Sequence, residues 1–342
     1  MRELSGKEQR VTHLLNKGNF LDPGEEVSPG TPVAFNAFPA GAPHNRLGLA
    51  AWLTASDNPL TARVAVNRFW AQLMGQAIVQ TEEDFGTQGT LPENQPLLDW
   101  LAVSFQSPKP AAGSPIDPLN PQLCWDFKGL IKLIANSAAY RQSSAVSPEL
   151  LRQDPLNKLY SRAPRRRLDA ETVRDQALAL SGLLSRKLGG PSVYPLQPDG
   201  LWRAAFNGER SWSTSTGEDR YRRGIYTFWR RTVPYPSMAT FDAPSRETCT
   251  LRRQPTNTPL QAFVTLNDPV FVEAAQALAL RVQAVPDTRR VDRLWELCLS
   301  RTPSPRERDW VTSYLKSQGS AERAWTALAS VLLNLDEFIT RE

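Results

Sequence analysis

Many of the 28 prolines in this chain directly follow a residue type that caps helices. A Ser, Thr, Asp or Asn side chain at the N-cap accepts a hydrogen bond from a free helix N–H, and proline at the next position loses only a donor that the helix does not use. Two sites continue into the capping-box pattern, Thr258-x-x-Gln261 and Ser304-x-x-Glu307. The pattern therefore predicts a mainly helical chain, with helix starts at Asn58-Pro59, Ser147-Pro148, Asp154-Pro155, Thr258-Pro259, Asp268-Pro269 and Ser304-Pro305.

The spacing of hydrophobic residues supports the same fold class. After Asn58-Pro59, Val66, Phe69, Trp70 and Leu73 share one helical face, and Gly75 suits a C-cap. With 342 residues, 41% of them hydrophobic, the chain can bury a substantial core. We expect one mainly α, bundle-like domain over 12–338, with further helices over 97–105, 127–134 and 168–188, the last ending at Gly189-Gly190-Pro191, and three or four more within 259–338.

Two segments lack helical periodicity. Residues 107–122 contain five prolines, so they are expected to form a surface loop or an insertion. Residues 194–258 form a longer irregular region. Within it, the apolar and aromatic run Gly224–Trp229 is flanked by paired arginines, which predicts a buried strand and a small β element around 222–233.

The short motifs of common enzymes and cofactor sites are absent. The sequence has no H-E-x-x-H, G-x-S-x-G, P-loop, G-x-G-x-x-G or C-x-x-C-H pattern. His13 and His44 are the only histidines, and Cys124, Cys249 and Cys298 lie far apart. A His-based triad, a metal site and attached haem are therefore not expected, and no cofactor is predicted. The sequence favours a non-catalytic role without excluding an enzyme.

Carboxylates are the remaining candidates for catalysis. Glu171 and Asp175 are four residues apart, so they share a helix face, and Arg167 and Arg174 lie on the same helix. One interpretation is a pair of carboxylates for acid/base or metal chemistry. The other, which we prefer, is a structural network of ion pairs, with Arg167 four residues before Glu171.

Asp242 and Arg246 form a second candidate group. Both lie in a proline-bounded loop after the expected strand, and loops on a rigid scaffold often carry function. Aspartate and serine also close turns, so a turn-forming role for Asp242 is the alternative. We expect the network around Glu171 to tie its helix to the loop Asp242–Arg246.

Basic and aromatic residues gather in the C-terminal part. Residues 1–150 contain 11 basic and 14 acidic side chains, whereas residues 151–342 contain 29 and 21. Arginines beside aromatic faces can bind sugars, anionic polymers or acidic proteins, although a core strand with arginines at its ends would have the same sequence. Trp202 and Trp212 are expected outside any helix as an exposed stacking platform. The predicted binding residues are Trp202, Trp212, Arg222, Arg223, Arg230, Arg231 and Arg246.

The order of these segments resembles one known family. The likeness extends from about residue 12 to 338, and its motifs are Asn58–Trp70, Thr81–Gly86, Leu97–Leu101, Ser137–Ser144, Arg167–Asp175, Phe241–Arg246 and Thr256–Ala262 with Leu266-Asn267. It resembles planctomycete-specific domain one, a domain-of-unknown-function family. The family pattern typically has Ser-His-Pro where this chain has Asn94-Gln95-Pro96, so any role of that histidine is lost here.

The resemblance implies a context rather than a reaction. Members usually form the C-terminal part of large exported proteins, often with a cytochrome-c-like module, and no catalytic residue can be transferred from the family. Export, to the periplasm or the cell exterior, is thus implied, although the N-terminus shows no signal peptide and no apolar run is long enough for a membrane span. The sequence favours an accessory module that docks to other domains of the parent protein, a neighbouring protein or a polymeric ligand such as a glycan. A carboxylate-dependent enzyme acting on glycans and polyanion binding by the basic C-terminal part are the alternatives, and nucleic acid is a poor candidate in an exported protein.

Overall fold

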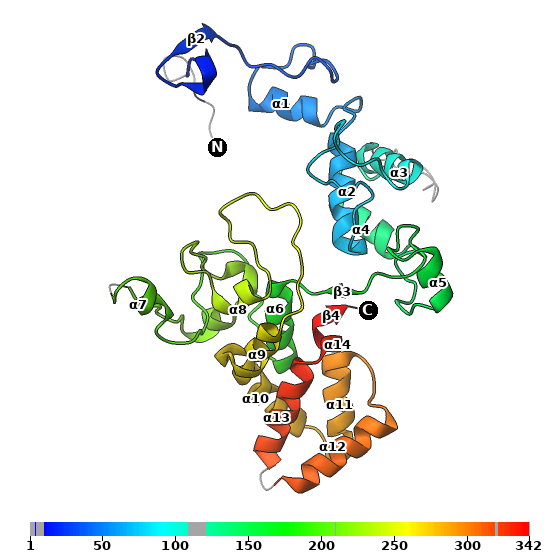
Figure 1. Cartoon of the computed structure of the whole chain (residues 1–342), viewed down its shortest axis with the longest axis vertical. Helices are drawn as coiled ribbons and strands as arrows, with labels where there is room; N and C mark the ends of the chain where they lie inside the picture. Colours follow the sequence, from blue (N-terminus) through cyan, green and yellow to red (C-terminus); the bar gives the residue numbers. More distant parts are fainter. Residues whose placement is uncertain (1–3, 5–9, 109–120, 209, 319–320, 342) are drawn as a thin grey trace. The chain divides into compact units, whose positions relative to one another are not determined.

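The computed structural model describes residues 4, 10–108, 121–208, 210–318 and 321–341. The chain divides into two compact units, unit 1 over Met1–Pro164 and unit 2 over Arg165–Glu342 (Figure 1). Most of the expected insertion, 109–120, lies outside the described residues. The expected single family domain over 12–338 stays a prediction. Within the described residues, no helix combines the length and the apolar character that a membrane span requires.

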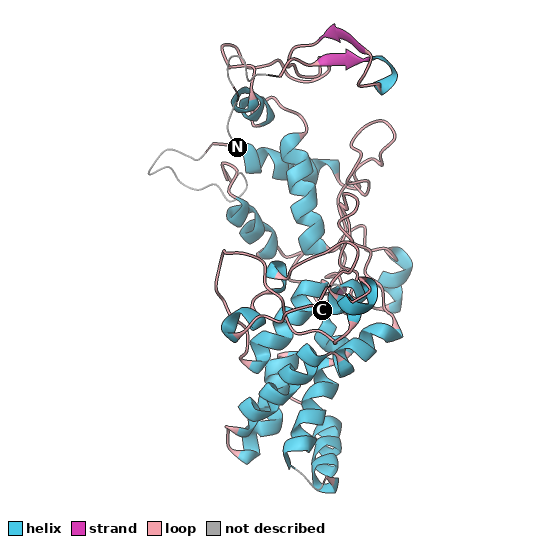
Figure 2. Cartoon of the chain, turned by 90° about the vertical axis from the view of Figure 1, so that its left-hand side faces the viewer, coloured by secondary structure: helices cyan, strands magenta, loops and turns pink. Residues whose placement is uncertain are grey.

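Unit 1 is built from a small hairpin followed by short helices (Figure 2). Strands β1 and β2 pair antiparallel, with His13 opposite Glu26. The elements are β1 (His13–Leu15), the 3-10 helix η2 (Asn16–Gly18), β2 (Pro23–Glu26), α1 (Arg46–Leu53), α2 (Thr61–Met74), α3 (Gln95–Gln106), α4 (Phe127–Ala135) and α5 (Pro148–Gln153).

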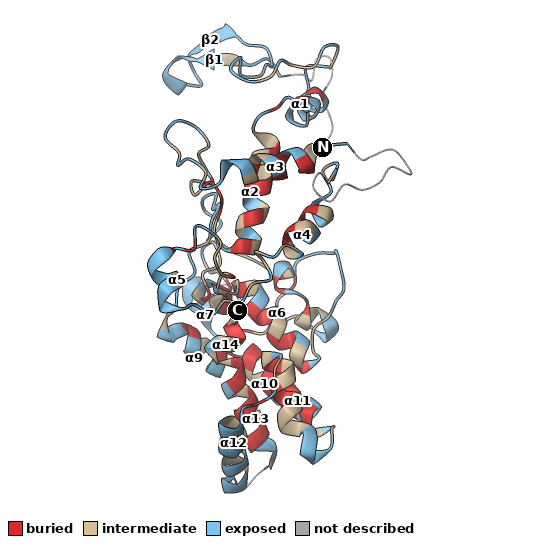
Figure 3. Ribbon diagram, turned by 90° about the vertical axis from the view of Figure 1, so that its right-hand side faces the viewer, coloured by how far each residue is buried: buried red, intermediate tan, exposed pale blue. Residues whose placement is uncertain are grey.

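The core of unit 1 lies where α2, α3 and α4 pack together. The predicted helix after Asn58-Pro59 is confirmed, because Asn58 accepts bonds from the backbone N–H groups of Leu60 and Thr61, and α2 ends at left-handed Gly75. Figure 3 colours the ribbon red where residues are buried. The buried residues of this core are Val66, Trp70, Met74, Ile78, Val79, Leu98, Leu101, Phe105, Leu130 and Ile134.

Unit 2 consists of packed helices together with the irregular region 194–258. Its elements are β3 (Arg166–Arg167), α6 (Ala170–Ser181), α7 (Leu201–Ala205), the 3-10 helices η3 (Gly217–Tyr221) and η4 (Gly224–Tyr226), α8 (Pro236–Thr240), α9 (Pro259–Asn267), α10 (Pro269–Gln283), α11 (Asp287–Leu299), α12 (Pro305–Ser317), α13 (Ala321–Leu333), α14 (Asp336–Ile339) and β4 (Thr340–Arg341).

Helix α10 is the centre of unit 2. It packs mainly against α13 and α6, and its side chains Phe271, Ala274 and Leu278 are buried (Figures 1 and 3). Small residues such as Ala274 and Ala275 allow the neighbouring helices to approach closely. The large side chain of Trp295 on α11 closes the core. Part of the irregular region 194–258 packs against these helices, because η4 and α8 both contact α6.

The fold is mainly α with small β elements, as predicted, but the β structure around 222–233 differs from the expectation. Residues Gly224–Tyr226 form a 3-10 helix, and only single bridges join Arg222 to Ser185 and Thr227 to Val193. The expected strand over 224–229 is wrong because the Gly224 N–H donates to a side chain and the Thr227 N–H closes a turn onto Gly224. These two backbone donors are thereby taken out of a strand ladder, although the Phe228 N–H still donates to the Val193 carbonyl.

Three expected helix ends also differ. Helix α6 stops at Gly182, which has φ +83°, and not at Gly189-Gly190-Pro191, because glycine enters the left-handed region without steric cost. Asp154 starts no helix, and its carboxylate instead accepts the Lys158 and Leu159 N–H groups in a turn. The Ser304 capping box is confirmed, whereas Thr258 makes no side-chain cap although α9 begins after it.

Candidate functional site

The buried side chain of Gln261 joins residues from separate sequence motifs. Gln261 lies on α9 and is 1% exposed. Its amide oxygen accepts from Nε and Nη2 of Arg167 at 3.1 and 2.9 Å. Its amide nitrogen donates to the Thr240 carbonyl at 3.0 Å and the Thr256 hydroxyl at 3.2 Å. One amide therefore uses both its donor and acceptor capacity to link β3, the end of α8 and the segment before α9.

Asp242 closes a long loop beside this amide. Its Oδ2 accepts from the Thr256 N–H at 2.6 Å, and its Oδ1 accepts from the Thr256 hydroxyl at 2.9 Å. Asp242 has φ +62°, a left-handed conformation that aspartate adopts more readily than most residues. This geometry favours the turn-forming role of Asp242 over that of a catalytic acid. The connection from Asp242 to Thr256 is called the 242–256 loop below.

Glu171 on α6 holds the same loop through Arg253. The two guanidinium nitrogens Nη1 and Nη2 of Arg253 donate to Oε2 and Oε1 of Glu171 at 2.6 and 2.9 Å. Burial acts to raise the pKa of Glu171, but the bonds from Arg253 and the nearby Arg246 charge leave the pKa below its ordinary value. The expected pairing of Glu171 with Arg167 is wrong, because Arg167 turns to Gln261 and to Asp336 at 3.2 Å. A tie between this helix and the 242–256 loop is nevertheless present, but it is made by Arg253, which lies beyond the expected segment Asp242–Arg246.

Asp175 holds a different segment against α6. Its Oδ1 accepts from the Gly224 N–H at 2.6 Å, and Arg174 and Arg223 each approach its carboxylate at 3.6 Å. Burial dominates these contacts and raises the pKa of Asp175. Glycine is needed at 224, because an added Cβ would lie 3.0 Å from the Glu171 Cβ. The carboxylate thus caps a backbone turn that packs closely on α6.

Of the three candidate carboxylates, Asp242 lines the small cavity beside Gln261, and Glu171 and Asp175 do not. The cavity that Arg167, Asp242, Arg253 and Gln261 line has a volume of about 10 Å³, which is room for about one water molecule. Each carboxylate already accepts two or more close hydrogen bonds or ion contacts. The described residues include no group of three or more potential metal ligands. This arrangement is suited to holding a loop in place.

The 242–256 loop has a fixed base and an exposed middle. Besides Asp242 and Arg253, its base is held by Trp229, whose indole N–H donates to the Ser245 carbonyl at 3.1 Å. Arg246, with φ +64°, places its guanidinium 5.0 Å from the Trp229 ring centre. Every residue from 245 to 252 is exposed. Figure 1 shows this connection between α8 and α9 as an extended yellow loop.

Two of the clustered arginines are structural. Arg174 is 2% exposed and donates to the Arg222 carbonyl at 2.7 Å. Arg222 is 1% exposed, lies 3.8 Å from the Tyr226 ring centre and donates to backbone carbonyls, among them Pro191 at 3.4 Å. The side chain of Arg222 is therefore not on the surface as the sequence suggested. It binds carbonyl groups that the irregular backbone cannot pair by itself.

The tryptophans predicted as an exposed platform are packed inside unit 2. Trp202 lies in the short helix α7, is 7% exposed and packs against Trp212, with the ring centres 5.5 Å apart and the rings tilted by 57°. Trp212 is half-buried and donates its indole N–H to the Pro195 carbonyl at 2.7 Å. The expectation that Trp202 is exposed and non-helical is thus wrong, because an aromatic cluster with Phe206 and Phe228 covers it.

The other predicted binding arginines differ in exposure. Arg230 is half-buried, with its guanidinium 4.8 Å from the Phe206 ring centre. Arg223, Arg231 and Arg246 are exposed. Neither Arg231 nor Arg246 has a carboxylate within 4 Å among the described residues. These exposed side chains remain candidates for binding an acidic ligand.

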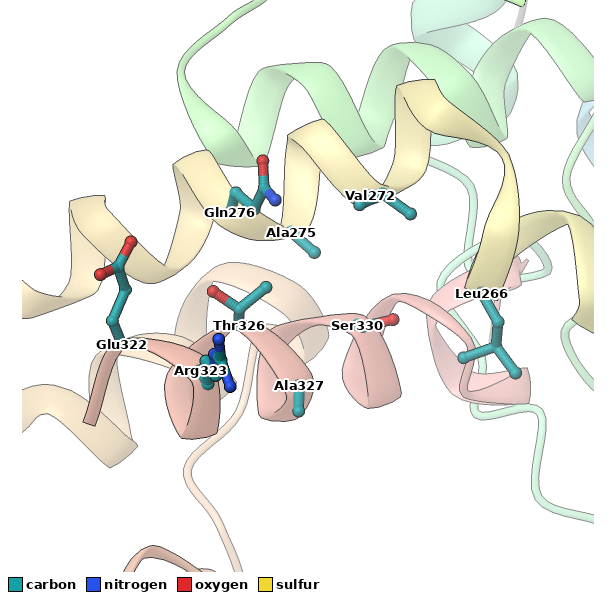
Figure 4. A pocket seen from close by; sticks show the side chains of 9 residues that line it. All are labelled: Leu266, Val272, Ala275, Gln276, Glu322, Arg323, Thr326, Ala327 and Ser330. Atoms are coloured by element: carbon teal, nitrogen blue, oxygen red, sulfur yellow. The ribbon is translucent and has the colours of Figure 1, made fainter. Parts of the chain in front are cut away.

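A larger groove lies between α10 and α13 (Figure 4). Its volume is about 860 Å³, and its lining includes Val272, Gln276 and Thr326. Among the described residues, its charged lining side chains are Glu322 and Arg323, and Leu266 lies at the opposite end in Figure 4. The small side chains between Glu322 and Leu266 leave space that forms the groove. The described lining residues offer no arrangement of acid, base and nucleophile.

The comparison with protein families identifies the chain. The family described as PSD1, a protein of unknown function (DUF1553), matches residues 45–315. The chain belongs to this family. No curated protein and no solved structure gives a significant match. The PSD1 match spans both the unit 1 core and the cluster around Gln261, so it supports the resemblance seen in the sequence motifs.

Sequence reasoning missed three residues of this cluster: Arg253, Thr256 and Gln261. The three-residue spacing from Thr258 to Gln261 is that of a capping box, so it indicated a local role at a helix start. Thr256 and Gln261 lie within a motif of the family resemblance, which marked the segment without giving its contacts. Nothing in the local sequence distinguishes Arg253 from its neighbour Arg252, which is exposed.

Proposed function

We propose that this PSD1 chain is a non-catalytic interaction module, and that the 242–256 loop binds an acidic surface of a partner domain or protein. One observation carries the proposal. The three carboxylates that could perform chemistry anchor backbone and arginine groups, while Arg246 and Arg252 at the loop's exposed part have no carboxylate within 4 Å among the described residues.

The fixed base makes the loop suitable for recognition. A loop whose ends are held loses less conformational entropy on binding than a free one. Trp229 also restrains the guanidinium of Arg246, which is exposed and can donate two parallel hydrogen bonds to a carboxylate. Arg231 follows Trp229 closely in sequence and is exposed as well. The charge of residues 151–342, with 29 basic and 21 acidic side chains, favours an acidic partner.

The resemblance supplies a context for the partner. If the parent is an exported planctomycete-type protein with a cytochrome-c-like module, the acidic surface belongs to another domain of that parent or to a neighbouring protein. A glycan-acting enzyme receives less support, because Glu171 and Asp175 are engaged separately, one by Arg253 and the other by the Gly224 N–H. Polyanion binding would use the same arginines, so an experiment must separate the two.

Immobilised poly-L-glutamate provides a defined carboxylate surface, and heparin provides a sulfated one. We expect the wild type to bind poly-L-glutamate, and the double variant Arg246→Ala/Arg252→Ala to bind it about tenfold more weakly. Arg306→Ala, which removes an exposed arginine on α12, is the matched control and should bind like the wild type. Equal binding by all three proteins would refute the role of the loop. Binding to heparin alone would favour a polyanion ligand.

A further inference from the structure

Another pocket in unit 2 lies apart from the 242–256 loop. It has a volume of about 390 Å³, which lies in the range of small-molecule sites. Its lining includes Gln197, Asp199, Trp202, Arg203 and Ser211. The carboxylates and the buried amide discussed above do not contribute to it.

Two residues that line this pocket each carry a buried polar atom with no hydrogen-bond partner among the described residues. Gln197 is 6% exposed, and its Oε1 is an acceptor with no partner among the described residues. Trp202 is 7% exposed, and its Nε1 is a donor that also has no partner among the described residues. Native proteins rarely leave such groups unpaired, because burial without a partner is costly. The nearby Trp212 shows the usual outcome, since its indole N–H donates to the Pro195 carbonyl.

We propose that this pocket binds a neutral sugar ring of an oligosaccharide. A sugar hydroxyl both donates and accepts, so adjacent hydroxyl groups can supply the partners that Gln197 Oε1 and Trp202 Nε1 lack. Both atoms are closed to water in the ligand-free state, so the ligand reaches them as the side chains adjust on binding. The missing bonds are then gained in the bound state.

The charge of the lining selects for a neutral ligand. Among the described residues, its charged lining side chains are Asp199 and Arg203, one of each sign, and both are exposed. The attraction of an anion to Arg203 would be offset by its repulsion from Asp199. A neutral sugar avoids this repulsion, and its hydroxyl groups can form hydrogen bonds with Asp199 and with Arg203. Sugars are commonly recognised by this combination of aromatic surface and planar polar side chains.

Aromatic and cationic side chains surround the ring of Trp202. Trp202 packs against Phe206 at 5.6 Å and Phe228 at 6.2 Å, and the Arg230 guanidinium lies 5.7 Å from its ring. The half-buried Trp212 also lines the pocket. A sugar ring can therefore pack against the exposed part of the Trp212 indole, and its hydroxyl groups meet Gln197 and Trp202 once these side chains have adjusted.

The experiment uses the full chain and a panel of neutral probes: cellohexaose, xylohexaose, mannohexaose and chitohexaose, with hexaglycine as a peptide probe. Calorimetric titration should show binding of at least one sugar. Gln197→Leu and Trp202→Phe, which remove one polar atom each and keep much of the side-chain volume, should weaken it at least tenfold. Trp310→Phe, on the exposed face of α12, is the control and should bind normally.

Thermal unfolding separates binding from folding. Because Gln197→Leu removes an unpaired buried acceptor, its melting temperature should equal or exceed that of the wild type. If this variant fails to fold, Trp202→Phe carries the test. Wild-type binding to none of the sugars, binding that both variants retain, or binding to hexaglycine alone would each overturn the proposal. None of these outcomes changes the poly-L-glutamate result expected for the 242–256 loop.

Discussion

Arg253 binds Glu171 through its two terminal guanidinium nitrogens, Nη1 and Nη2, at 2.6 and 2.9 Å, although the two residues are 82 positions apart. The pair joins the start of α6 to the end of the 242–256 loop. About a quarter of the Glu171 side chain and a third of the Arg253 side chain remain exposed, so solvent weakens the pair without removing it. Its effect on stability is therefore measurable and moderate.

Removing the carboxylate charge of Glu171 should destabilise unit 2. We expect Glu171→Gln to lower the free energy of unfolding by about 1–2 kcal/mol, because charged hydrogen bonds from Arg253 are lost. A double-mutant cycle with Arg253→Gln should give a coupling of similar size. The folded-state pKa of Glu171 is lowered from its ordinary 4.5, so this stability is present at neutral pH and is lost as the pH falls below about 4.5. A coupling near zero would show that the contact is not energetically significant.

The Gln261 side chain should control the order of the 242–256 loop. Gln261→Leu keeps the volume but leaves the Arg167 guanidinium and the Thr240 carbonyl without their amide partner. We expect a loss of about 1–3 kcal/mol in unfolding free energy and faster cleavage by trypsin at Arg246 or Arg252. Gln276→Leu, on the α10–α13 groove, is the comparison and should leave the cleavage rate unchanged. Equal cleavage of both variants would contradict the role of Gln261.

The Arg246 side chain should contribute to ligand binding but not to the stability of the fold. Its φ of +64° is unfavourable for a residue with a Cβ, by about 1 kcal/mol, and glycine adopts it freely. We expect Arg246→Gly to leave the free energy of unfolding unchanged or raise it by up to about 1 kcal/mol, since the lost stacking on Trp229 offsets part of the gain. The same variant should bind poly-L-glutamate more weakly. Clear destabilisation by chemical denaturation would show that Arg246 is mainly structural.

Asp268 should make unit 2 less stable as the pH rises through the acidic range. Its carboxylate is buried at the start of α10 and accepts from the Val270 N–H at 3.0 Å. Burial raises its pKa from 3.8 to about 6, although Val270 and Arg174 oppose the shift. The folded protein then binds more protons than the unfolded chain between about pH 4 and 6, so the stability contribution of Asp268 falls across that window.

Asp268→Asn removes this titration and keeps a side chain that caps helices well. We expect the variant to match the wild type near pH 4 and to be more stable at pH 7 by about 1–3 kcal/mol. Denaturant unfolding at several pH values measures the difference. A difference that does not change between pH 4 and pH 7 would contradict the raised pKa.

Local patterns in the sequence predicted much of the secondary structure. Ser304-x-x-Glu307 gave a capping box, Gly75 ended a helix, and Asp268-Pro269 started α10, because each of these effects depends on side chains within a few residues of the backbone they cap. The family resemblance also came from the sequence, and the PSD1 match confirms it over residues 45–315. The motif segments around 167–175, 241–246 and 256–262 were marked as important, although their contacts were not known.

Tertiary structure decided which partners the charged and aromatic groups have. Arg167, Glu171 and Gln261 each had a plausible partner three or four residues away, yet all three bind residues more than 15 positions distant. Trp202 is also buried by rings from outside its own helix, those of Trp212 and Phe228. Sequence spacing fixes neighbours along a helix, but long-range contacts depend on how α6, α9 and α10 pack. That packing brings Arg253 rather than Arg167 to Glu171, and it leaves Arg246 and Arg252 exposed.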